Sequence, residues 1–361
     1  MGYSISYTAM DNKVAFIDLE DEITQTELNE IVEIGAFDRI QCQFVPQETS
    51  LRLLNTYYSK FPQTGFRIYG GISDESIDLT FLSSLTKIRK LSIGVYGTII
   101  ATETIDQLRE LESLEISVGA VDSFDFIEGL PDTVKYFGCE TKSKTLDLSL
   151  LSNISNLKTL RICGYKKNIE SLAELPLLED LLLKGITLDN IDFINRIQKL
   201  KLLKIQWGGI NDYTALYGNA QIKGLQLFRI NKLTDLTLLS QLPNLQVVEL
   251  AWLRHIGCLP NLSKHKNLQH ILLDDMKSLL DLSALEHIES LKTVSFSCCP
   301  SAFVPENIVP VIKNYAVEQC SFYTSSQKKN DDIARLILKS GKVNKSNFSD
   351  VRALLFPDWR K

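Results

Sequence analysis

One apolar pattern constrains the fold of this sequence more than any other feature. Leu245, Val248 and Leu250 follow the spacing apolar-x-x-apolar-x-apolar, and triplets of the same kind begin at Leu268 and Leu291. Each of these triplets starts 23 residues after the previous one. Apolar residues at alternate positions indicate a short strand with one buried face. The constant period indicates that one such strand recurs in every structural repeat.

The triplet recurs over most of the chain. Towards the N-terminus it begins at intervals of 21 to 23 residues, at Ile222, Leu200, Leu178, Leu157, Val134, Leu111 and Ile88. One further step towards the C-terminus places a last triplet at Ile312, Tyr315 and Val317. A chance apolar pattern would lose its phase within a few repeats. We therefore predict one continuous array of stacked coils over residues 87–320.

Residues 1–86 keep the pattern with longer steps, which predicts an N-terminal cap and repeats that are backed by helices. Apolar and polar residues alternate over residues 3–7, which favours a strand that returns antiparallel into a second strand over residues 14–19. Helical spacing over residues 24–35 and 46–61 predicts two helices between the following strands. This part is expected to continue directly into the array.

Residues 321–361 lack the triplet and are expected to form a C-terminal helical cap. An amphipathic helix is predicted over residues 330–340 and a second, shorter helix over residues 349–355. We expect Phe348, Leu355 and Trp359 to close the last coil. A cap is needed there because an exposed terminal coil would present apolar surface and a free strand edge.

The pattern resembles the leucine-rich repeat superfamily, in particular the short repeats of 22 to 23 residues found in internalin-like bacterial proteins and in phosphatase regulators. The resemblance implies an α/β solenoid with a curved parallel β-sheet on the concave face. Short helices, 3-10 turns and loops would form the convex face. Those families place asparagine eight residues after each triplet start, whereas this sequence has Tyr96, Gly119, Lys142, Tyr165, Ile186, Gly208, Ile230, Leu253, Met276 and Cys299. The asparagine ladder is absent, and both tyrosines are expected in the core.

The composition is that of an ordinary globular protein. Of the 361 residues, 44% are hydrophobic and 23% charged, and the net charge of −5 offers no basic surface for nucleic acid. No apolar run approaches the roughly 20 residues that span a membrane, and the N-terminal residues do not resemble a secretory signal. Seven scattered cysteines without a C-x-x-C motif argue against a disulfide framework or a zinc site. We expect a cytoplasmic location.

No motif for catalysis or cofactor binding is found. The sequence has no phosphate-binding loop, no G-x-G-x-x-G and no H-E-x-x-H. Different faces of adjacent coils are expected to hold the four histidines as ordinary surface residues, namely His255, His265, His270 and His287. Cys298 and Cys299 lack an oriented histidine that would activate a thiol. The prediction is a protein without enzyme activity, cofactor or metal.

The strand positions between the triplet residues are expected to face the concave surface. In one region they carry large apolar side chains, namely Leu182, Leu202, Trp207, Phe228, Val247, Trp252 and Leu272. An apolar surface rimmed by charge usually marks a protein-binding site, where tryptophan and arginine contribute strongly. The predicted partner-binding residues are Arg161, Lys184, Lys204, Trp207, Phe228, Arg229, Glu249, Trp252, His270, Asp274 and Asp275. The alternative is that the tryptophans fold over the coil edge as structural cover.

These observations favour a protein-recognition module that holds one specific protein on its concave face. The resemblance to leucine-rich repeat proteins without signal peptides or catalytic domains implies a bacterial immunity protein that neutralises a toxin. The alternative is an effector, adaptor or scaffold protein that bridges two partners. Nucleic acid and membranes are not expected as partners.

Overall fold

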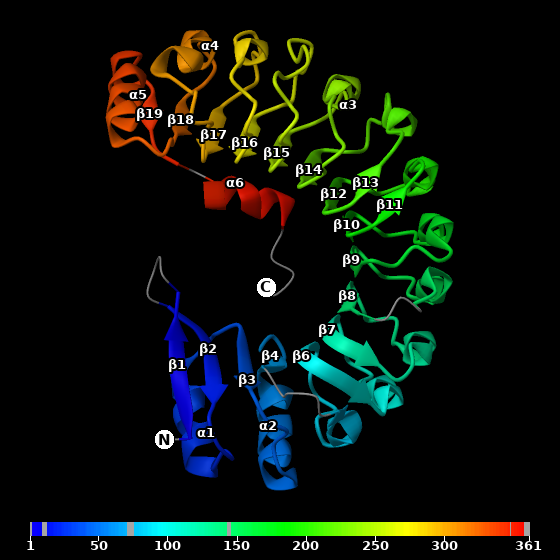
Figure 1. Cartoon of the computed structure of the whole chain (residues 1–361). Helices are drawn as coiled ribbons and strands as arrows, with labels where there is room; N and C mark the ends of the chain where they lie inside the picture. The colour runs from blue at the N-terminus through cyan, green and yellow to red at the C-terminus, as the bar shows by residue number, and fades with distance from the viewer. Residues whose placement is uncertain (1, 9–12, 71–75, 143–145, 347, 357–361) are drawn as a thin grey trace. The chain divides into compact units, whose positions relative to one another are not determined.

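The apolar triplets fold into coils that stack on one another. In each coil a strand lies on one side, and a 3-10 helix, an α-helix or a loop lies on the other (Figure 1). The triplet side chains lie between the two sides, and Leu245, Leu250 and Leu273 are fully buried. One coil is too thin to bury its own apolar side, so each coil depends on the coils before and after it.

The computed structural model describes residues 2–8, 13–70, 76–142, 146–346 and 348–356. The chain forms two compact units, which are Met1–Leu178 (unit 1) and Glu179–Pro357 (unit 2). None of the helices in the described ranges is long and apolar enough to cross a membrane.

Unit 1 begins with an antiparallel strand pair and continues with parallel strands. Its elements are β1 (Tyr3–Tyr7), β2 (Val14–Leu19), α1 (Gln25–Ile34), β3 (Arg39–Cys42), α2 (Glu48–Lys60), β4 (Gly65–Gly70), β5 (Ile77–Asp78), η1 (Leu79–Ser84), β6 (Lys90–Ile100), η2 (Thr102–Gln107), β7 (Ser113–Val121), η3 (Asp125–Gly129), β8 (Tyr136–Thr141), η4 (Leu148–Asn153), β9 (Thr159–Cys163) and η5 (Ile169–Glu174).

The predicted N-terminal strand pair and helices are confirmed. Strand β1 pairs antiparallel with β2, and Ile5 lies opposite Ile17. Helix α1 begins at a capping box, in which the Thr24 hydroxyl accepts from the Glu27 backbone N–H and the Glu27 carboxylate accepts from Thr24. It ends at Gly35, whose φ of 87° suits glycine.

Unit 2 is a run of parallel strands in a constant register, in which Leu250 pairs with Leu273 and Leu273 with Phe296. Its elements are β10 (Asp180–Lys184), β11 (Thr187–Leu188), η6 (Asp192–Arg196), β12 (Leu202–Gln206), β13 (Gly209–Ile210), η7 (Thr214–Leu216), β14 (Gly224–Phe228), α3 (Thr237–Gln241), β15 (Val247–Ala251), β16 (His270–Asp274), η8 (Ser283–Leu285), β17 (Thr293–Ser297), η9 (Pro305–Ile308), α4 (Val309–Lys313), β18 (Gln319–Phe322), α5 (Gln327–Lys339), β19 (Val343–Asn344) and α6 (Phe348–Leu355).

The residue directly after each of five neighbouring strands of the sheet, β12, β14, β15, β16 and β17, has a left-handed backbone. None of the five residues is glycine. These residues are Trp207, Arg229, Trp252, Asp275 and Cys298. A left-handed conformation costs a non-glycine residue about 1–2 kcal/mol. The hydrogen-bond ladder offsets part of this cost: the Trp207 N–H donates to the Phe228 carbonyl at 3.0 Å and the Trp252 N–H to the Asp274 carbonyl at 2.9 Å.

Two sequence-based assignments are wrong. The last triplet is not Ile312, Tyr315 and Val317, because Ile312 lies in α4 and Tyr315 is 81% exposed. The last coil is longer, and its strand β18 instead pairs Cys320 with Val294. Tyr96 is not in the core either: it is 79% exposed, because a bulge in β6 leaves Val95 at the buried position. Tyr165, by contrast, is buried as expected.

The two C-terminal helices have different places in unit 2. Helix α5 packs against β18 and β19 at the end of the array, as a cap does. Helix α6 does not close the last coil: it contacts β14, β15 and β16 on the sheet side (Figure 1). The predicted contribution of Trp359 lies outside the described residues.

Two neighbouring glycines, Gly208 and Gly209, differ in the space around them. A Cβ atom added to Gly208 would lie 2.0 Å from the carbonyl oxygen of Ile186 in the preceding coil, whereas one added to Gly209 would meet nothing within 4 Å. Glycine at position 208 therefore allows the two coils to approach, and Thr187 then pairs with Gly209 between β11 and β13.

We expect Gly208→Ala to destabilise the protein by about 1–3 kcal/mol, because the added methyl group must push backbone against backbone. The matched change Gly209→Ala should alter the free energy of unfolding by less than about 1 kcal/mol. Urea denaturation followed by circular dichroism measures both. Equal stability of the two variants would contradict the packing described between these coils.

Candidate functional site

The sheet surface of unit 2 between β14 and β16 is covered by α6. Val247 and Leu272 of the sheet form a buried cluster with Val351 and Leu355 of the helix, and Phe348 and Phe356 pack against its edge. The prediction of an open apolar surface is therefore wrong at Val247 and Leu272, and Leu182 of β10 is buried as well. The sequence pattern identified an apolar surface correctly, but the chain itself supplies the cover.

Two of the predicted binding residues hold the covering helix. Lys204 is fully buried, forms an ion pair with Asp180 and donates from Nζ to the Leu355 carbonyl at 2.8 Å. Glu249 is also buried, and its Oε1 lies 3.3 Å from Arg352 Nε of α6. Burial raises the pKa of Glu249, while Arg352 and a hydrogen bond from Gln226 oppose the rise.

An aromatic row lies at the ends of β12, β14 and β15. The Phe228 ring centroid lies 6.4 Å from that of Trp207 and 6.3 Å from that of Trp252. The Arg229 guanidinium lies 5.7 Å and 5.6 Å from the two indole rings, and Lys184 Nζ lies 4.8 Å from the Trp207 ring. Trp207 is 52% exposed, so the row presents an aromatic and cationic surface to solvent. We refer to these five residues as the aromatic row.

The remaining predicted residues lie around this region or apart from it. His270 bonds through Nδ1 to the Thr293 hydroxyl at 2.9 Å, and burial lowers its pKa. Burial and the neighbouring Asp275 raise the pKa of Asp274, while Asp275 forms an ion pair with Lys277. Arg161 belongs to unit 1, where its guanidinium lies 5.4 Å from the Tyr136 ring centroid.

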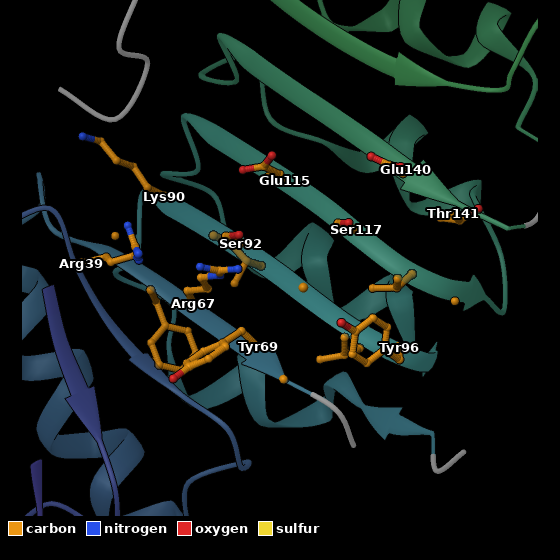
Figure 2. A pocket seen from close by; sticks show the side chains of 18 of the residues that line it. Arg39, Arg67, Tyr69, Lys90, Ser92, Tyr96, Glu115, Ser117, Glu140 and Thr141 are labelled. Atoms are coloured by element: carbon orange, nitrogen blue, oxygen red, sulfur yellow. The ribbon is translucent and has the colours of Figure 1, made fainter. Parts of the chain in front are cut away.

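Unit 1 contains a groove of about 690 Å³ on the sheet surface. Figure 2 shows side chains that line it, and most of the lining residues come from β3, β4, β6, β7 and β8. The floor lies along β6 and is made of small residues, Ser92 and Gly94, with Ser117 of β7 beside them. Larger side chains stand on both sides of this floor, so the groove runs along the strands.

The wall formed by β3 and β4 is basic and internally braced. The Arg67 guanidinium lies 5.1 Å from the Tyr69 ring centroid, and the Tyr69 hydroxyl donates to the Asp18 carboxylate at 2.5 Å. Gln41 also donates to Asp18, at 3.0 Å, and accepts from Arg39 Nε at 2.8 Å. Asp18 thus fixes the side chains of this wall, although it lies outside the groove lining.

The wall formed by β7 and β8 is acidic, with Glu115 and Glu140 (Figure 2). The strand register puts Arg67 beside Ser92 and Ser92 beside Glu115, so the two charges are two strand spacings apart, or about 10 Å. In the described part of the chain, neither Arg67 nor Glu115 forms an ion pair with another residue, and Arg67 Nε has no hydrogen-bond partner. The groove therefore holds a cation and an anion that are both available to a ligand.

Comparison with known proteins identifies the fold. No family model and no curated protein matches the sequence. Among solved structures, a leucine-rich repeat protein of Leptospira interrogans matches with a TM-score of 0.55 at 16% identity, over 90% of this chain and 88% of that one. An internalin of Listeria monocytogenes matches with a TM-score of 0.54 at 15% identity, over 84% and 89%. The chain has the leucine-rich repeat fold.

Sequence reasoning missed the groove because it searched this leucine-rich repeat array for large apolar side chains. The useful signal is the opposite one: Ser92, Gly94 and Ser117 place small residues on the exposed positions of adjacent strands. A run of small residues between charged neighbours indicates a depression in a repeat surface. The two tryptophans of the aromatic row, by contrast, drew attention because they occur at the same repeat position, two coils apart.

The histidines do not form a metal site. Among the described residues there is no group of three or more histidine, cysteine, aspartate or glutamate side chains that could hold a metal ion. His255 and His287 are exposed as expected. His265 is not a surface residue: it is 5% exposed, and its Nε2 donates to the Leu239 carbonyl at 2.9 Å. Burial lowers its pKa, so the imidazole is held neutral.

The burial of His265 predicts how the stability of the protein depends on pH. The unfolded chain binds a proton at His265 near pH 6.5, before the folded protein does, so acidification favours unfolding. Stability should therefore be retained above about pH 6.5 and fall below it. We expect His265→Gln to show a smaller loss of unfolding free energy between pH 7 and pH 5.5. Chemical denaturation at several pH values measures this, with the exposed His287→Gln as control. Equal pH dependence of the wild type and His265→Gln would contradict it.

Proposed function

We propose that this leucine-rich repeat protein is a non-enzymatic recognition module, and that unit 1 binds an extended segment of a protein partner in its groove. The observation that carries the proposal is the pair of opposed charges, Arg67 and Glu115, on either side of the Ser92 and Gly94 floor. Unsatisfied charges that face each other across an open groove are suited to a ligand that bears both signs.

The geometry favours a peptide segment over a compact ligand. The groove follows β6, and its walls are about 10 Å apart, which is two strand spacings. An acidic side chain of the segment would meet the planar guanidinium of Arg67, which the Tyr69 ring supports. A basic side chain would meet Glu115. Exposed Tyr96 at one end offers an apolar contact.

A second candidate function is an adaptor that holds two partners, and the aromatic row of unit 2 favours it. Trp207 and Arg229 of this row are exposed, and its composition of three aromatic and two cationic side chains is typical of binding hot spots. It shares no residue with the groove of unit 1. A more specific form of the first proposal is that the bound partner is a toxin, which the protein neutralises in the cytoplasm of a bacterium.

The charges in the groove predict the order of charges in its ligand. Selection of a displayed random-peptide library on the purified protein should enrich peptides that carry one acidic and one basic residue at a fixed spacing. The charge swap Arg67→Glu/Glu115→Arg should enrich peptides in which the two signs are exchanged. Replacing either Arg67 or Glu115 by alanine removes one charge-assisted hydrogen bond, which is worth about 1.5–3 kcal/mol. The affinity for each selected peptide should then fall about 10- to 100-fold.

The control is Arg109→Ala/Glu128→Ala, which removes two exposed charges of unit 1 outside the groove lining. This variant should select the same peptides as the wild type. If Arg67→Ala/Glu115→Ala also selects those peptides with unchanged affinity, the groove is not the binding site.

The aromatic row makes a separate prediction about partners. Cross-linking capture from cells of the source organism should lose one partner when Trp207→Ala/Trp252→Ala is used, because the stacked surface around Arg229 is removed. A partner held by the groove should persist in that variant and be lost with Arg67→Ala/Glu115→Ala. Tyr315→Ala, which removes an exposed aromatic ring elsewhere, is the control. Loss of the same partner in both double variants would contradict the adaptor proposal.

A further inference from the structure

The sheet surface beneath α6 differs from an ordinary core. Four polar side chains of unit 2 are buried there or beside it, namely Asp180, Lys204, Gln226 and Glu249. Burying charged groups is unfavourable unless they are paired, so cores rarely use them. These groups are paired on the sheet itself: Lys204 with Asp180, and Glu249 with Gln226 at 2.7 Å. The surface therefore keeps its internal pairing when it is open to water.

Helix α6 occupies this surface through one narrow apolar edge. Val351 and Leu355, four residues apart, are its buried side chains, and they pack on Val247 and Leu272. Leu354, on another side of the helix, is 50% exposed. Aliphatic residues at this spacing lie on the same helix face, which is how helices bind in apolar grooves.

Gly224 makes room for the helix. It lies in β14, and a Cβ atom added to it would come within 2.8 Å of Leu355 Cδ2 of the helix and 2.6 Å of Leu202 Cδ2 of the neighbouring strand β12. Any side chain at this position would occupy space that Leu355 and Leu202 fill. The glycine thus forms a small depression that matches one side chain of the helix.

Polar contacts set the direction of the bound helix. Lys204 Nζ donates to the Leu355 carbonyl at the C-terminal end, where the helix dipole is negative. Arg352, next to Val351, reaches Glu249 at 3.3 Å. A helix bound in the reverse direction would present its N-terminal N–H groups to the Lys204 ammonium group, so the surface accepts one orientation.

We propose that the sheet surface of β14–β16 is a binding surface for an amphipathic helix of a partner protein, and that α6 is its exchangeable resident. The partner helix carries two aliphatic side chains four residues apart, an arginine directly after the first of them, and a C-terminal end at Lys204. An eight-residue helix is too short to persist alone in water. The exposed residues 345 and 346 lead from β19 towards it, so α6 competes with the partner as a tethered ligand.

A release variant tests the exchange directly. The full chain with Val351→Ser/Leu355→Ser keeps the sheet surface but weakens its resident helix. The probe is a fluorescent synthetic peptide with the sequence of residues 346–361 of this chain. We expect the release variant to bind this peptide at least tenfold more tightly than the wild type, because the wild-type helix competes at a high effective concentration. A peptide carrying the same two serine changes should not bind.

The site of binding is tested by adding Gly224→Val to the release variant. Valine is favoured in strands, and the nearest sheet atom, Cδ2 of the half-buried Leu202, can turn aside, so this protein should fold, as its melting temperature will show. The added side chain should abolish peptide binding because it fills the space of Leu355. Unchanged peptide binding to this variant, or equal binding to the wild type and the release variant, would overturn the proposal.

Hydrogen exchange on the unaltered protein provides a second measurement that does not depend on the variants folding. We expect the amides of α6 to exchange at least 100-fold faster than those of β15, because the helix opens while the sheet stays folded. Equal protection of α6 and β15 would show that the helix is an integral part of the unit 2 core, and would overturn the proposal.

Discussion

The burial of each apolar triplet between neighbouring coils is the interaction on which the rest of this structure depends. A coil has one thin layer of leucine and isoleucine side chains, and this layer is shielded only when other coils stack on both sides. Stacking also forces the strands into register, as between Leu250 and Leu273. The positions between the triplet residues are then left on the sheet surface, where the stability of the coil does not dictate which residue is used.

The two units use this freedom in different ways. In unit 1 small residues such as Ser92 and Gly94 occupy the middle of the surface, and the charged neighbours become walls. In unit 2 the corresponding surface carries Val247 and Leu272, which bind a helix of the chain itself. The same backbone thus supports a groove with opposed charges in one unit and an apolar surface with paired charges in the other.

The sequence allowed the repeats to be predicted because their period is strict and every triplet has the same environment. It failed where the environment changes. The bulge after Val95 moved Tyr96 to the surface, and the longer last coil shifted the final strand to Cys320. The short helix α6 was predicted, but its position was not, because no local pattern distinguishes the end of the array from the sheet surface. The row at Trp207 was found from its periodicity, whereas the groove depends on several strands together.

The residues that follow five strands of unit 2 share a left-handed backbone, although their side chains differ. At four of these places, occupied by tryptophan, arginine and aspartate, the N–H donates to a carbonyl of the next coil. The same backbone path therefore occurs with different side chains. Because Arg229 lies beside both Trp207 and Trp252, neighbouring positions at this edge act together, and a change in one coil alters the surface that the next coil presents.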